Sequence, residues 1–373
     1  MNPTKEQFLD MMEQIAPRAY AESFDNVGLL IDVGVDTIRR VLLALDLTEV
    51  VAREAVEVGC DLVLTHHPIF FSPVQRLSVH DPTQAAAMIL LRNGISHLAA
   101  HTNFDSAPEG MNVQICELLE LEDHRALEPK KQAAYKIVTF VPASHAAAVR
   151  DAMAAAGAGK QGAYSHCSFS VEGEGRFRPL EGAKPYLGQT RMTEIVPEVR
   201  IECLALQKDC ANVLAAIRAS HPYEEPACDV FLEAEGMVDD RTGLTRMGRL
   251  HSSATLKNFA ETVKRTFGSA AVLFSGEPDR TVRTVAVSSG AGGGSWELAH
   301  RAGADVLVTG EAKYNQVLDA SACGVSIVQA GHYETERIGM QGMCRGLQSR
   351  ANQLQWGCEF LLSERETSPM HGV

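Results

Sequence analysis

Histidine and carboxylate residues stand at spacings that could hold a metal ion. Two histidines are each followed four positions later by a carboxylate, a spacing that brings side chains together on one helical face. Two further histidines stand side by side after a short apolar run. These six residues are His66, His67, His101, Asp105, His332 and Glu336. Imidazole nitrogen and carboxylate oxygen suit Zn, Fe, Mn, Co or Ni, so we predict a site for ions of this kind.

The chain contains an internal repeat that accounts for this pattern. Residues 41–67 align with residues 285–311 without a gap, and Gly59 of the first segment matches Gly303 of the second. Each segment is followed by a further glycine and then by one of the histidine–carboxylate pairs. Two related half-units that each supply nitrogen and oxygen ligands suggest one metal site shared between them.

Short apolar runs predict three strands in each half, with a helix between successive strands. The runs are residues 41–45, 62–64, 95–99, 282–287, 306–308 and a last one that begins at 327. Strands that alternate with helices pair in parallel through right-handed crossovers. All the candidate ligands follow such strands, and open parallel sheets bind ligands beyond the carboxyl ends of their strands.

The adjacent histidines leave two arrangements open. Neighbouring side chains of a strand point to opposite faces, so His66 and His67 serve one ion only if the chain bends there. Pro68 helps to end the strand and permits such a bend. Alternatively, the two histidines bind separate ions that lie side by side, and Glu336 bridges ions about 3.5–4 Å apart.

Three nearby polar residues have less defined roles. His101 is either a ligand or a residue that orients Asp105. Glu311 and Asp46 follow strands of the repeat, and each could instead cap a helix or face solvent. Glu311 and His101 are the candidate catalytic residues.

A glycine-rich segment, residues 288–295, lies between a strand and a helix of the second half. Its Gly290, Gly292, Gly293 and Gly294 could turn backbone N–H groups toward an anionic group of a substrate, such as a phosphate or a carboxylate. The alternative is a tight turn beneath a close-packed sheet. The segment is not a P-loop, because the Gly-Lys-Ser/Thr ending is missing.

The region between the halves breaks the repeat and predicts a separate domain. Its order of elements, β-α-β followed by β-α-β, is typical of a ferredoxin-like domain. We therefore predict an α/β protein with a duplicated three-layer α/β core and an α+β insert. The core comprises residues 1–128 and 241–373, and the insert comprises residues 129–240.

The insert contains the segment His-Pro-Tyr-Glu-Glu-Pro at residues 221–226. Prolines within and at the end of this segment fix an irregular stretch before a strand. One interpretation is a rigid edge or lid over the site. The other makes His221 or Glu224 a substrate contact or a proton carrier.

Composition excludes some classes of function. The formal net charge of -13 and the lack of a dense basic run argue against nucleic-acid binding. No apolar run approaches the roughly 20 residues that span a bilayer. The nine cysteines are scattered without a Cys-x-x-Cys pair, which is typical of reduced thiols in a cytosol. We expect a cytoplasmic protein that acts on a small molecule, without a membrane or nucleic-acid partner.

Five segments together resemble the Nif-three-like proteins, which are commonly labelled GTP cyclohydrolase I type two homologues. They are residues 24–30, 64–68, 101–105, 309–311 and 331–336. The match covers both outer parts of the chain, and the insert is similar to the PII- and CutA-like insert of the longer bacterial members. The chain differs at Phe24, where the family usually has Trp.

The resemblance implies a dinuclear metal site, a toroidal homohexamer and a cytoplasmic location. Carried over position by position, the ligands of two divalent ions are His66, His67, Asp105, His332 and Glu336. The resulting hypothesis is a metal-dependent hydrolase of a small anionic or nucleotide-like substrate. The alternative is a non-enzymatic protein that binds or delivers metal, or a regulatory scaffold whose insert senses a ligand.

Overall fold

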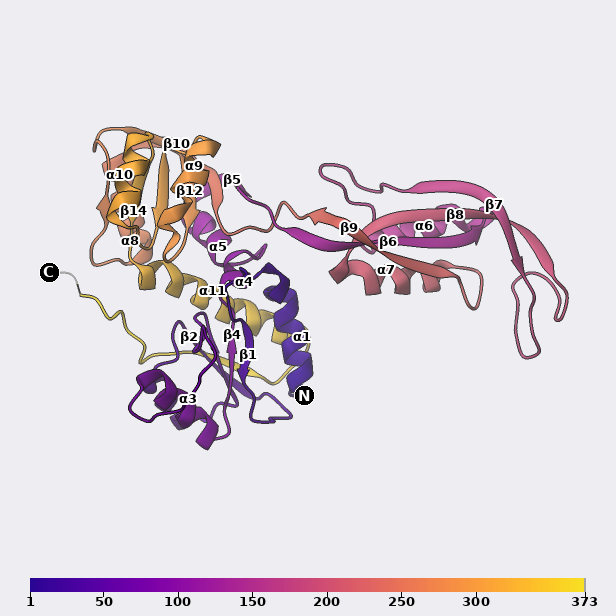
Figure 1. Cartoon of the computed structure of the whole chain (residues 1–373), viewed down its shortest axis with the longest axis horizontal. Helices are drawn as coiled ribbons and strands as arrows, with labels where there is room; N and C mark the ends of the chain where they lie inside the picture. The colour runs from indigo at the N-terminus through magenta and orange to yellow at the C-terminus, as the bar shows by residue number, and fades with distance from the viewer. Residues whose placement is uncertain (372–373) are drawn as a thin grey trace. The chain divides into compact units, whose positions relative to one another are not determined.

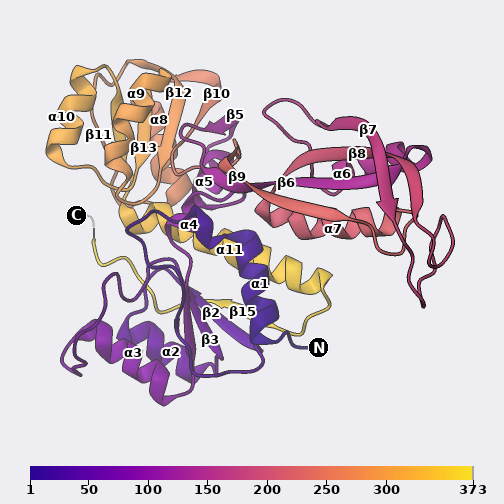
Figure 2. The same cartoon turned by 45° about the vertical axis from the view of Figure 1, so that its right-hand side comes forward.

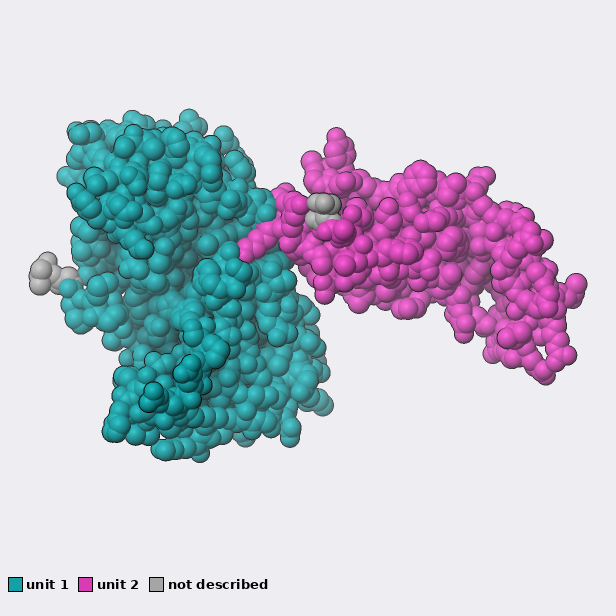
Figure 3. All heavy atoms as spheres, in the orientation of Figure 1, with its two compact units in different colours: residues 1–129, 241–373 teal, residues 130–240 magenta. Residues whose placement is uncertain are grey.

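The chain folds into two compact units. The computed structural model describes residues 1–371, without the side chain of Glu235. Unit 1 comprises Met1–Pro129 and Arg241–Val373, and unit 2 comprises Lys130–Asp240. Figure 3 shows the two units in different colours. All the candidate metal ligands belong to unit 1.

The first half of unit 1 contributes most of a five-stranded sheet with the order β1-β4-β3-β2-β15. Its strands are β1 (Gly28–Ile31), β2 (Arg40–Ala44), β3 (Leu62–Thr65), β4 (Ser96–Ala99) and β15 (Glu359–Leu362). Strands β4, β3, β2 and β15 are parallel, and β1 is antiparallel to β4. Helices α2 (Glu49–Glu57) and α3 (Pro82–Arg92) cover the outer face. Both faces of the sheet are covered, so every residue of β3 is buried.

The second half contributes most of a six-stranded sheet with the order β11-β14-β13-β12-β10-β5. Its strands are β5 (Leu121–Ala126), β10 (Arg246–Thr255), β11 (Leu273–Phe274), β12 (Thr281–Ser288), β13 (Val306–Thr309) and β14 (Ser326–Gln329). Strands β12, β13 and β14 are parallel, and the other three pair in antiparallel fashion. Helices α9 (Trp296–Ala302) and α10 (Tyr314–Ala322) cover the outer face. Each half thus has the predicted strand–helix–strand–helix–strand order, which confirms the duplication.

The inner faces of both sheets share one hydrophobic core with four helices. These helices are α1 (Lys5–Ile15), α5 (Met111–Leu118), α8 (Leu256–Phe267) and α11 (His332–Gln353). Phe8 of α1, Phe259 of α8 and Leu347 of α11 are all buried in this core. Figures 1 and 2 show α11 between the sheet of the first half and the sheet of the second. Each half is therefore three-layered, and the halves share their inner layer.

The two halves also exchange strands. Strand β5 follows α5 of the first half, yet it pairs with β10 in the second sheet. Strand β15 follows α11 of the second half and pairs with β2 in the first sheet, where Phe360 lies opposite Val41. Each half therefore contributes one strand to the sheet of the other. This exchange links the two halves of unit 1.

Some helices of unit 1 begin at a residue whose side chain caps the helix. The hydroxyl of Thr4 accepts from the backbone N–H of Gln7, whose side chain accepts in return from Thr4, as in a capping box. The hydroxyl of Thr48 accepts from the backbone N–H of Val51 and so caps the start of α2. The longest helix, α11, has 22 residues and includes glycines and charged side chains. Among residues 1–371, no helix combines the length and apolar character that a membrane crossing needs.

Unit 2 has a four-stranded antiparallel sheet with the order β7-β8-β6-β9. Its elements are β6 (Lys131–Pro142), η2 (Ala143–His145), α6 (Ala146–Ala155), β7 (Phe169–Phe177), β8 (Glu194–Leu206), α7 (Gln207–Ser220) and β9 (Cys228–Val238). Both helices pack on one face of the sheet around Val149 and Ile217. In this order the first and third strands are central and the second and fourth are at the edges, which confirms the predicted ferredoxin-like insert.

Candidate metal centre

The candidate ligands of the first half come from the ends of two neighbouring strands. His66 and His67 directly follow β3. His101 stands two residues after β4 and directly before the short helix α4 (Thr102–Asp105), whose last residue is Asp105. Because β3 and β4 are parallel neighbours, their carboxyl ends bring these four side chains to one edge of the sheet.

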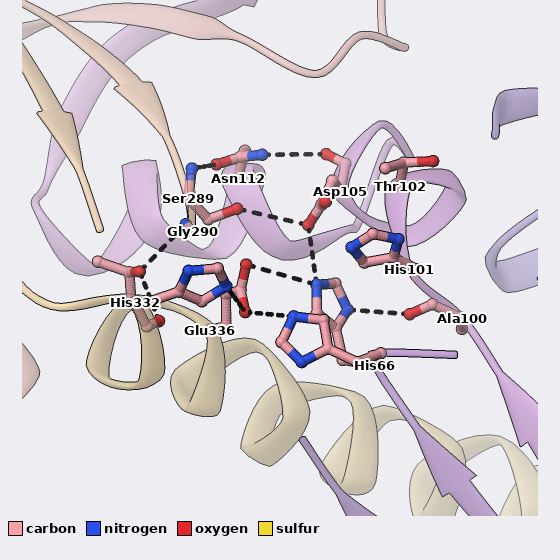
Figure 4. Close-up of polar contacts among 12 residues, drawn as sticks. His66, Ala100, His101, Thr102, Asp105, Asn112, Ser289, Gly290, His332 and Glu336 are labelled. Carbon is pink, nitrogen blue, oxygen red and sulfur yellow. Dashed lines mark hydrogen bonds and ion pairs between the residues drawn. The ribbon is translucent and has the colours of Figure 1, made fainter. Parts of the chain in front are cut away.

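The second half supplies one imidazole and one carboxylate from the start of α11. His332 is the first residue of this helix and Glu336 follows one turn later, so both side chains project from one face. Figure 4 shows them pointing toward the side chains of the first half. The Nε2 atoms of His332 and His67 lie 3.0 Å and 3.1 Å from the same oxygen, Oε2 of Glu336.

The carboxylate of Glu336 occupies the middle of this centre. Its Oε1 atom lies 3.7 Å from Nε2 of His66, and that nitrogen lies 3.6 Å from Oδ1 of Asp105. Both carboxylates and the imidazole of His66 are buried. Each oxygen of Glu336 therefore faces imidazole nitrogen, which is the arrangement required of a carboxylate that bridges two cations.

The chain departs from regular strand geometry at the adjacent histidines. The backbone N–H groups of His66 and His67 both donate to the segment beside them, at Ala44 and Leu45. Successive residues of a regular strand face opposite directions instead. The hydroxyl of Thr65 also donates to the carbonyl of His67 across 2.6 Å. Both imidazoles consequently lie at the centre, with their ring centroids 5.1 Å apart.

Each of the four imidazoles uses its Nδ1 atom to contact an oxygen at the periphery of the centre. The pairs are His66 with the carbonyl of Ala100 (2.9 Å), His67 with Asp46 (2.9 Å), His101 with Asp25 (2.9 Å) and His332 with Glu311 (3.3 Å). Such contacts fix the ring orientation and place the proton on Nδ1, which leaves Nε2 for a metal ion. The same arrangement at all four rings is typical of metal-binding histidines.

Three buried atoms of the centre make no hydrogen bond of regular geometry among residues 1–371, although two of them form the ion pair between His332 and Glu336. They are Nε2 of His66, Nε2 of His332 and Oε2 of Glu336. Folded proteins pair nearly all buried polar atoms, so such a cluster requires another partner. Imidazole nitrogens and carboxylate oxygens are donors that divalent transition ions accept. The residues present therefore fit a bound divalent ion.

The electrostatics of the centre favour positive charge. Burial opposes the charge of Glu336, but the surrounding imidazoles outweigh burial and hold the pKa of this carboxyl well below its usual range. Burial likewise lowers the pKa of His67, but Asp46 and Glu336 together raise this pKa to about 10. The contact with Glu336 raises the pKa of His332 to about 8. Without another cation, these two imidazoles therefore hold protons at neutral pH.

Among the described residues, the ligand atoms of five of the six candidates form two overlapping groups, and Asp105 belongs to neither. One contains His66, His67 and His101, and the other contains His67, His332 and Glu336; the ligand atoms of each group lie within 4.8 Å of one another. The ring of His101 lies with its centroid 5.0 Å from that of His66. This geometry favours the ligand interpretation of His101 that the sequence left open. Two overlapping groups can accommodate two ions, and the number of ions stays a prediction.

The glycine-rich turn lies against the centre rather than open to an anion. Gly290 donates its N–H to the hydroxyl of Thr335, and a Cβ atom at Gly290 would lie only 2.0 Å from Oε1 of Glu336. The N–H groups of Gly292 and Gly293 donate to backbone carbonyls. Of the four glycines only Gly292 lines the cleft beside the centre. These bonds support the tight-turn alternative, in which glycine permits a close approach to the carboxylate.

A cleft with a volume of about 950 Å³ opens onto the centre. His67 and His332 are partly exposed within it. Two aromatic side chains, Phe24 and Phe71, also line the cleft and are 67% and 52% exposed, and exposed Val50 lies at its wall. The volume and the mixture of apolar walls with a polar centre are typical of a site for a small molecule.

The sequence did not identify Asp25 as part of the centre. Its Oδ1 atom contacts Nδ1 of His101, and its Oδ2 atom accepts from the backbone N–H of Thr102 at 3.0 Å. Burial opposes its charge, but His101 and Thr102 outweigh burial and lower the pKa of Asp25 to about 2. The available signal was the family-like segment 24–30, in which Asp25 stands next to the atypical Phe24.

The C-terminal segment adds a second residue that sequence reasoning missed. The carboxylate of Glu366 accepts hydrogen bonds from the backbone N–H groups of Leu45 and Asp46, directly after β2. Asp46 in turn contacts Nδ1 of His67. Glu366 thus fixes the segment that orients one of the candidate ligands, although it stands more than 300 positions away in the sequence.

The fold and the centre define a class of protein: two related α/β halves whose strand ends meet at a histidine–carboxylate centre suited to divalent ions. The family model described as Duf34/NIF3 (NGG1p interacting factor 3) matches residues 3–369. The chain belongs to this family.

Relatives of known sequence and structure match nearly the whole chain. A protein of Bacillus subtilis (strain 168) named GTP cyclohydrolase 1 type 2 homolog is 38% identical over 365 residues, which cover 98% of this chain and 97% of the relative. A solved Bacillus cereus protein related to NIF3 is 35% identical with a TM-score of 0.86, and both chains are fully covered. Staphylococcus aureus protein SA1388 is 28% identical with a TM-score of 0.75, covering 100% of this chain and 99% of that one. The predicted family and fold class are confirmed.

Proposed function

We propose that the chain is a metal-dependent hydrolase of a small anionic or nucleotide-like substrate. The observation that carries the proposal is the convergence of three imidazole Nε2 atoms on the two oxygens of the buried Glu336, beside a cleft of small-molecule size. Buried imidazole Nε2 and carboxylate oxygen atoms that face each other without a regular hydrogen bond are a costly arrangement unless a cation completes it.

In this proposal the centre holds two divalent ions between the halves. The residues that would bind them are His66, His67, His101, Asp105, His332 and Glu336. Two ions are favoured because the ligand atoms form two overlapping groups and because each oxygen of Glu336 faces a different set of imidazoles. Several metals suit such ligands, namely Zn, Fe, Mn, Co and Ni.

The chain's own residues orient the ligands and receive the substrate. Bound divalent ions would lower the pKa of a coordinated water molecule from about 15.7 toward about 7, which supplies a nucleophile at neutral pH. Asp46 and Glu311 contact Nδ1 of His67 and His332 and so direct each Nε2 into the centre. We therefore assign Glu311 a positioning role in place of its candidate role in proton transfer.

The cleft supports the substrate class. A centre that binds cations attracts an anionic group, and the exposed rings of Phe24 and Phe71 offer apolar surface to the remainder of the molecule. A nucleotide combines both properties, since it joins a planar base to phosphate. The names of the relatives point in the same direction, because GTP is the nucleotide in the name of the Bacillus subtilis relative.

Turnover assays with matched variants test this proposal. The metal-loaded protein is incubated with nucleoside triphosphates, including GTP, and with aryl phosphate mono- and diesters. Glu336→Gln removes the central charge at constant shape, and Glu117→Gln removes an exposed carboxylate of α5 as a control. We expect turnover that is lost in Glu336→Gln and retained in Glu117→Gln.

Absence of turnover on every member of the panel, by protein that retains its metal, would contradict the hydrolase proposal. The non-enzymatic alternative then gains support if metal passes readily from the protein to an acceptor chelator. The partial exposure of His67 and His332 in the cleft is the feature that such a transfer would use.

The family resemblance also leads us to propose a cytoplasmic homohexamer. All nine cysteines are free, which supports a reducing compartment. A hexamer would have about six times the chain mass of 40.4 kDa in light-scattering measurements. A monomeric mass at micromolar concentration would contradict this part of the proposal.

A further inference from the structure

Unit 2 contains a second cavity, separate in chain position from the metal centre. Its volume is about 460 Å³, within the range of small-molecule sites. It lies at the end of the β7–β8 hairpin and reaches the segment 221–226 that the sequence singled out. Aromatic residues and carboxylates line it together, including Phe177, Tyr186, Tyr223 and Glu198.

The aromatic rings of this cavity cluster around Tyr223. The ring centroid of Phe177 lies 5.8 Å from that of Tyr223, at an interplanar angle of 56°. The centroid of Tyr186 lies 6.3 Å from that of Tyr223, at 46°. The rings are tilted rather than stacked, and all three line the cavity. Faces of aromatic rings carry negative electrostatic potential and attract cations.

A carboxylate is fixed within the same cavity. The hydroxyl of Tyr223 donates to Oε1 of Glu198 at 2.7 Å, and Oε2 accepts from no residue in the described range 1–371. A Cβ atom at Gly175 on the neighbouring strand would lie 2.1 Å from Oε2, so glycine there makes room for the carboxylate. Burial and Glu198 together raise the pKa of Tyr223, which keeps this hydroxyl a donor. Glu198 thus retains accepting capacity for a further group.

The segment that carries Tyr223 is held rigidly. The side chain of His221 is buried, its Nε2 atom contacts the carbonyl of Phe140 at 2.9 Å, and its Nδ1 atom accepts from the backbone N–H of Tyr223. The carboxylate of Glu224 accepts from the backbone N–H of Lys184, which joins the segment to the loop after β7. These bonds set the position of the cavity wall before any ligand arrives, which reduces the entropic cost of binding.

The charges at the cavity favour a cation. Of its two arginines, Arg176 is paired with Glu174 at 2.7 Å and Arg178 donates to the hydroxyl of Thr193. The remaining carboxylates of the lining are Glu198, Glu224 and Glu225. Acidic groups therefore outnumber the basic ones beside the aromatic rings.

We propose that this cavity binds a small organic cation, an ammonium or guanidinium group with an apolar body. The charged head contacts Glu198 and the faces of the aromatic rings, and the apolar body fills the remaining space. The inference concerns unit 2 alone and goes beyond the hydrolase proposal, because neither the ions nor the substrate of the metal centre enters it. It gives the insert a ligand of defined chemistry.

Calorimetric titration of the full chain tests the proposal with three cations and two matched controls. The cations are phenethylammonium, phenylguanidinium and tetramethylammonium. The controls are 2-phenylethanol, which is a neutral analogue of phenethylammonium, and phenylacetate, which is anionic. We expect at least one cation to bind with a Kd about tenfold or more below that of the alcohol, because a charge-assisted contact is worth about a factor of ten or more.

Variants locate the binding. Glu198→Gln should raise the Kd of the cation about tenfold or more and leave that of the alcohol unchanged, whereas Tyr223→Phe should raise it less because the carboxylate remains. Glu172→Gln, on β7 outside the cavity, is the matched control and should change neither. Thermal denaturation of each variant checks that it folds.

Two results would overturn the proposal. One is the failure of all three cations to bind better than the neutral and anionic controls. The other is binding that Glu198→Gln and Tyr223→Phe both leave unchanged although His332→Ala abolishes it, which would place the cation at the metal centre. Neither result bears on hydrolysis, since turnover is measured with other substrates and with Glu336→Gln.

Discussion

Replacement of Gly290 by alanine should remove metal from the centre and leave the fold intact. Gly290 has a φ of +56°, and a Cβ atom there would lie 2.0 Å from Oε1 of Glu336 and 3.1 Å from Nε2 of His332. Ordinary contact begins at 3.4 Å, so the carboxylate must move by about 1.4 Å. Metal–ligand distances tolerate deviations of only about 0.2 Å. Loss of this ligand position should weaken metal binding by at least about a hundredfold.

Gly303 provides a matched control for the backbone cost. It has a φ of +79°, and a Cβ atom there would meet nothing within 4 Å. Alanine in a left-handed conformation costs about 1–2 kcal/mol, so both variants should lose about this free energy of unfolding. Only Gly290→Ala should also lose metal, because only its methyl group meets a ligand.

Two measurements separate these effects. Competition titration with a chromogenic chelator gives the metal affinity, and denaturation followed by circular dichroism gives the free energy of unfolding of the metal-free proteins. Wild-type metal affinity in Gly290→Ala would refute the reasoning, because Glu336 could not then be a ligand where the structure places it. Equal loss of affinity in Gly303→Ala would show that the effect comes from the backbone.

Three further predictions concern the surroundings of the centre. Asp46→Asn should weaken metal binding about 10- to 100-fold, because the contact to Nδ1 of His67 loses its charge. Unchanged metal affinity in the same chelator titration would contradict this prediction. The pKa values of His67 and His332 are raised to about 10 and about 8, and both protons must leave before metal binds. Metal affinity should therefore rise with pH by up to about a hundredfold per unit below pH 8 and by up to about tenfold per unit between pH 8 and 10. Titrations at three pH values check this, and a flat profile would contradict it. Glu366→Ala should lower the free energy of unfolding by about 1–3 kcal/mol in urea denaturation, because two N–H groups after β2 lose their acceptor. A variant as stable as wild type would contradict this and show that water replaces the carboxylate as acceptor.

The repeated half-unit could be predicted because its strands are encoded locally. Runs such as residues 62–64 and 306–308 are buried on both faces, so their sequences are uniformly apolar. Polar residues that directly follow such runs must lie at the carboxyl edge of the sheet. His66 could therefore be placed at the carboxyl edge of the first sheet and His332 at that of the second, without knowledge of the tertiary structure.

The exchange of strands between the halves could not be predicted in this way. Strands β5 and β15 are ordinary short strands, and nothing in their sequences indicates which sheet they join. Helix α11 precedes β15 and packs in the core shared by both sheets, and that packing involves residues far apart in the sequence.

The residues that contact the candidate ligands could not be predicted from the sequence either. Asp25 contacts His101 from 76 positions away, and the carbonyl of Ala100 contacts His66 from 34. For Asp25 the sequence signal was the family-like segment 24–30, which gives no role for the residue, and a backbone carbonyl has no sequence signal at all. In the glycine-rich turn, by contrast, the sequence suggested a site that the structure does not favour. Its composition permits an anion site, but the N–H groups of Gly290 and Gly292 donate within the protein.

Metal content is the measurement that tests the centre most directly. Untagged protein is dialysed exhaustively and analysed by mass spectrometry for transition metals, beside His332→Ala, Asp105→Ala and the control His251→Ala, whose exposed side chain lies on β10. We predict about two tightly held ions per chain in the wild type and the control, and loss of metal in the other two variants. Wild-type protein that retains no metal, or equal retention in all variants, would contradict the proposed centre.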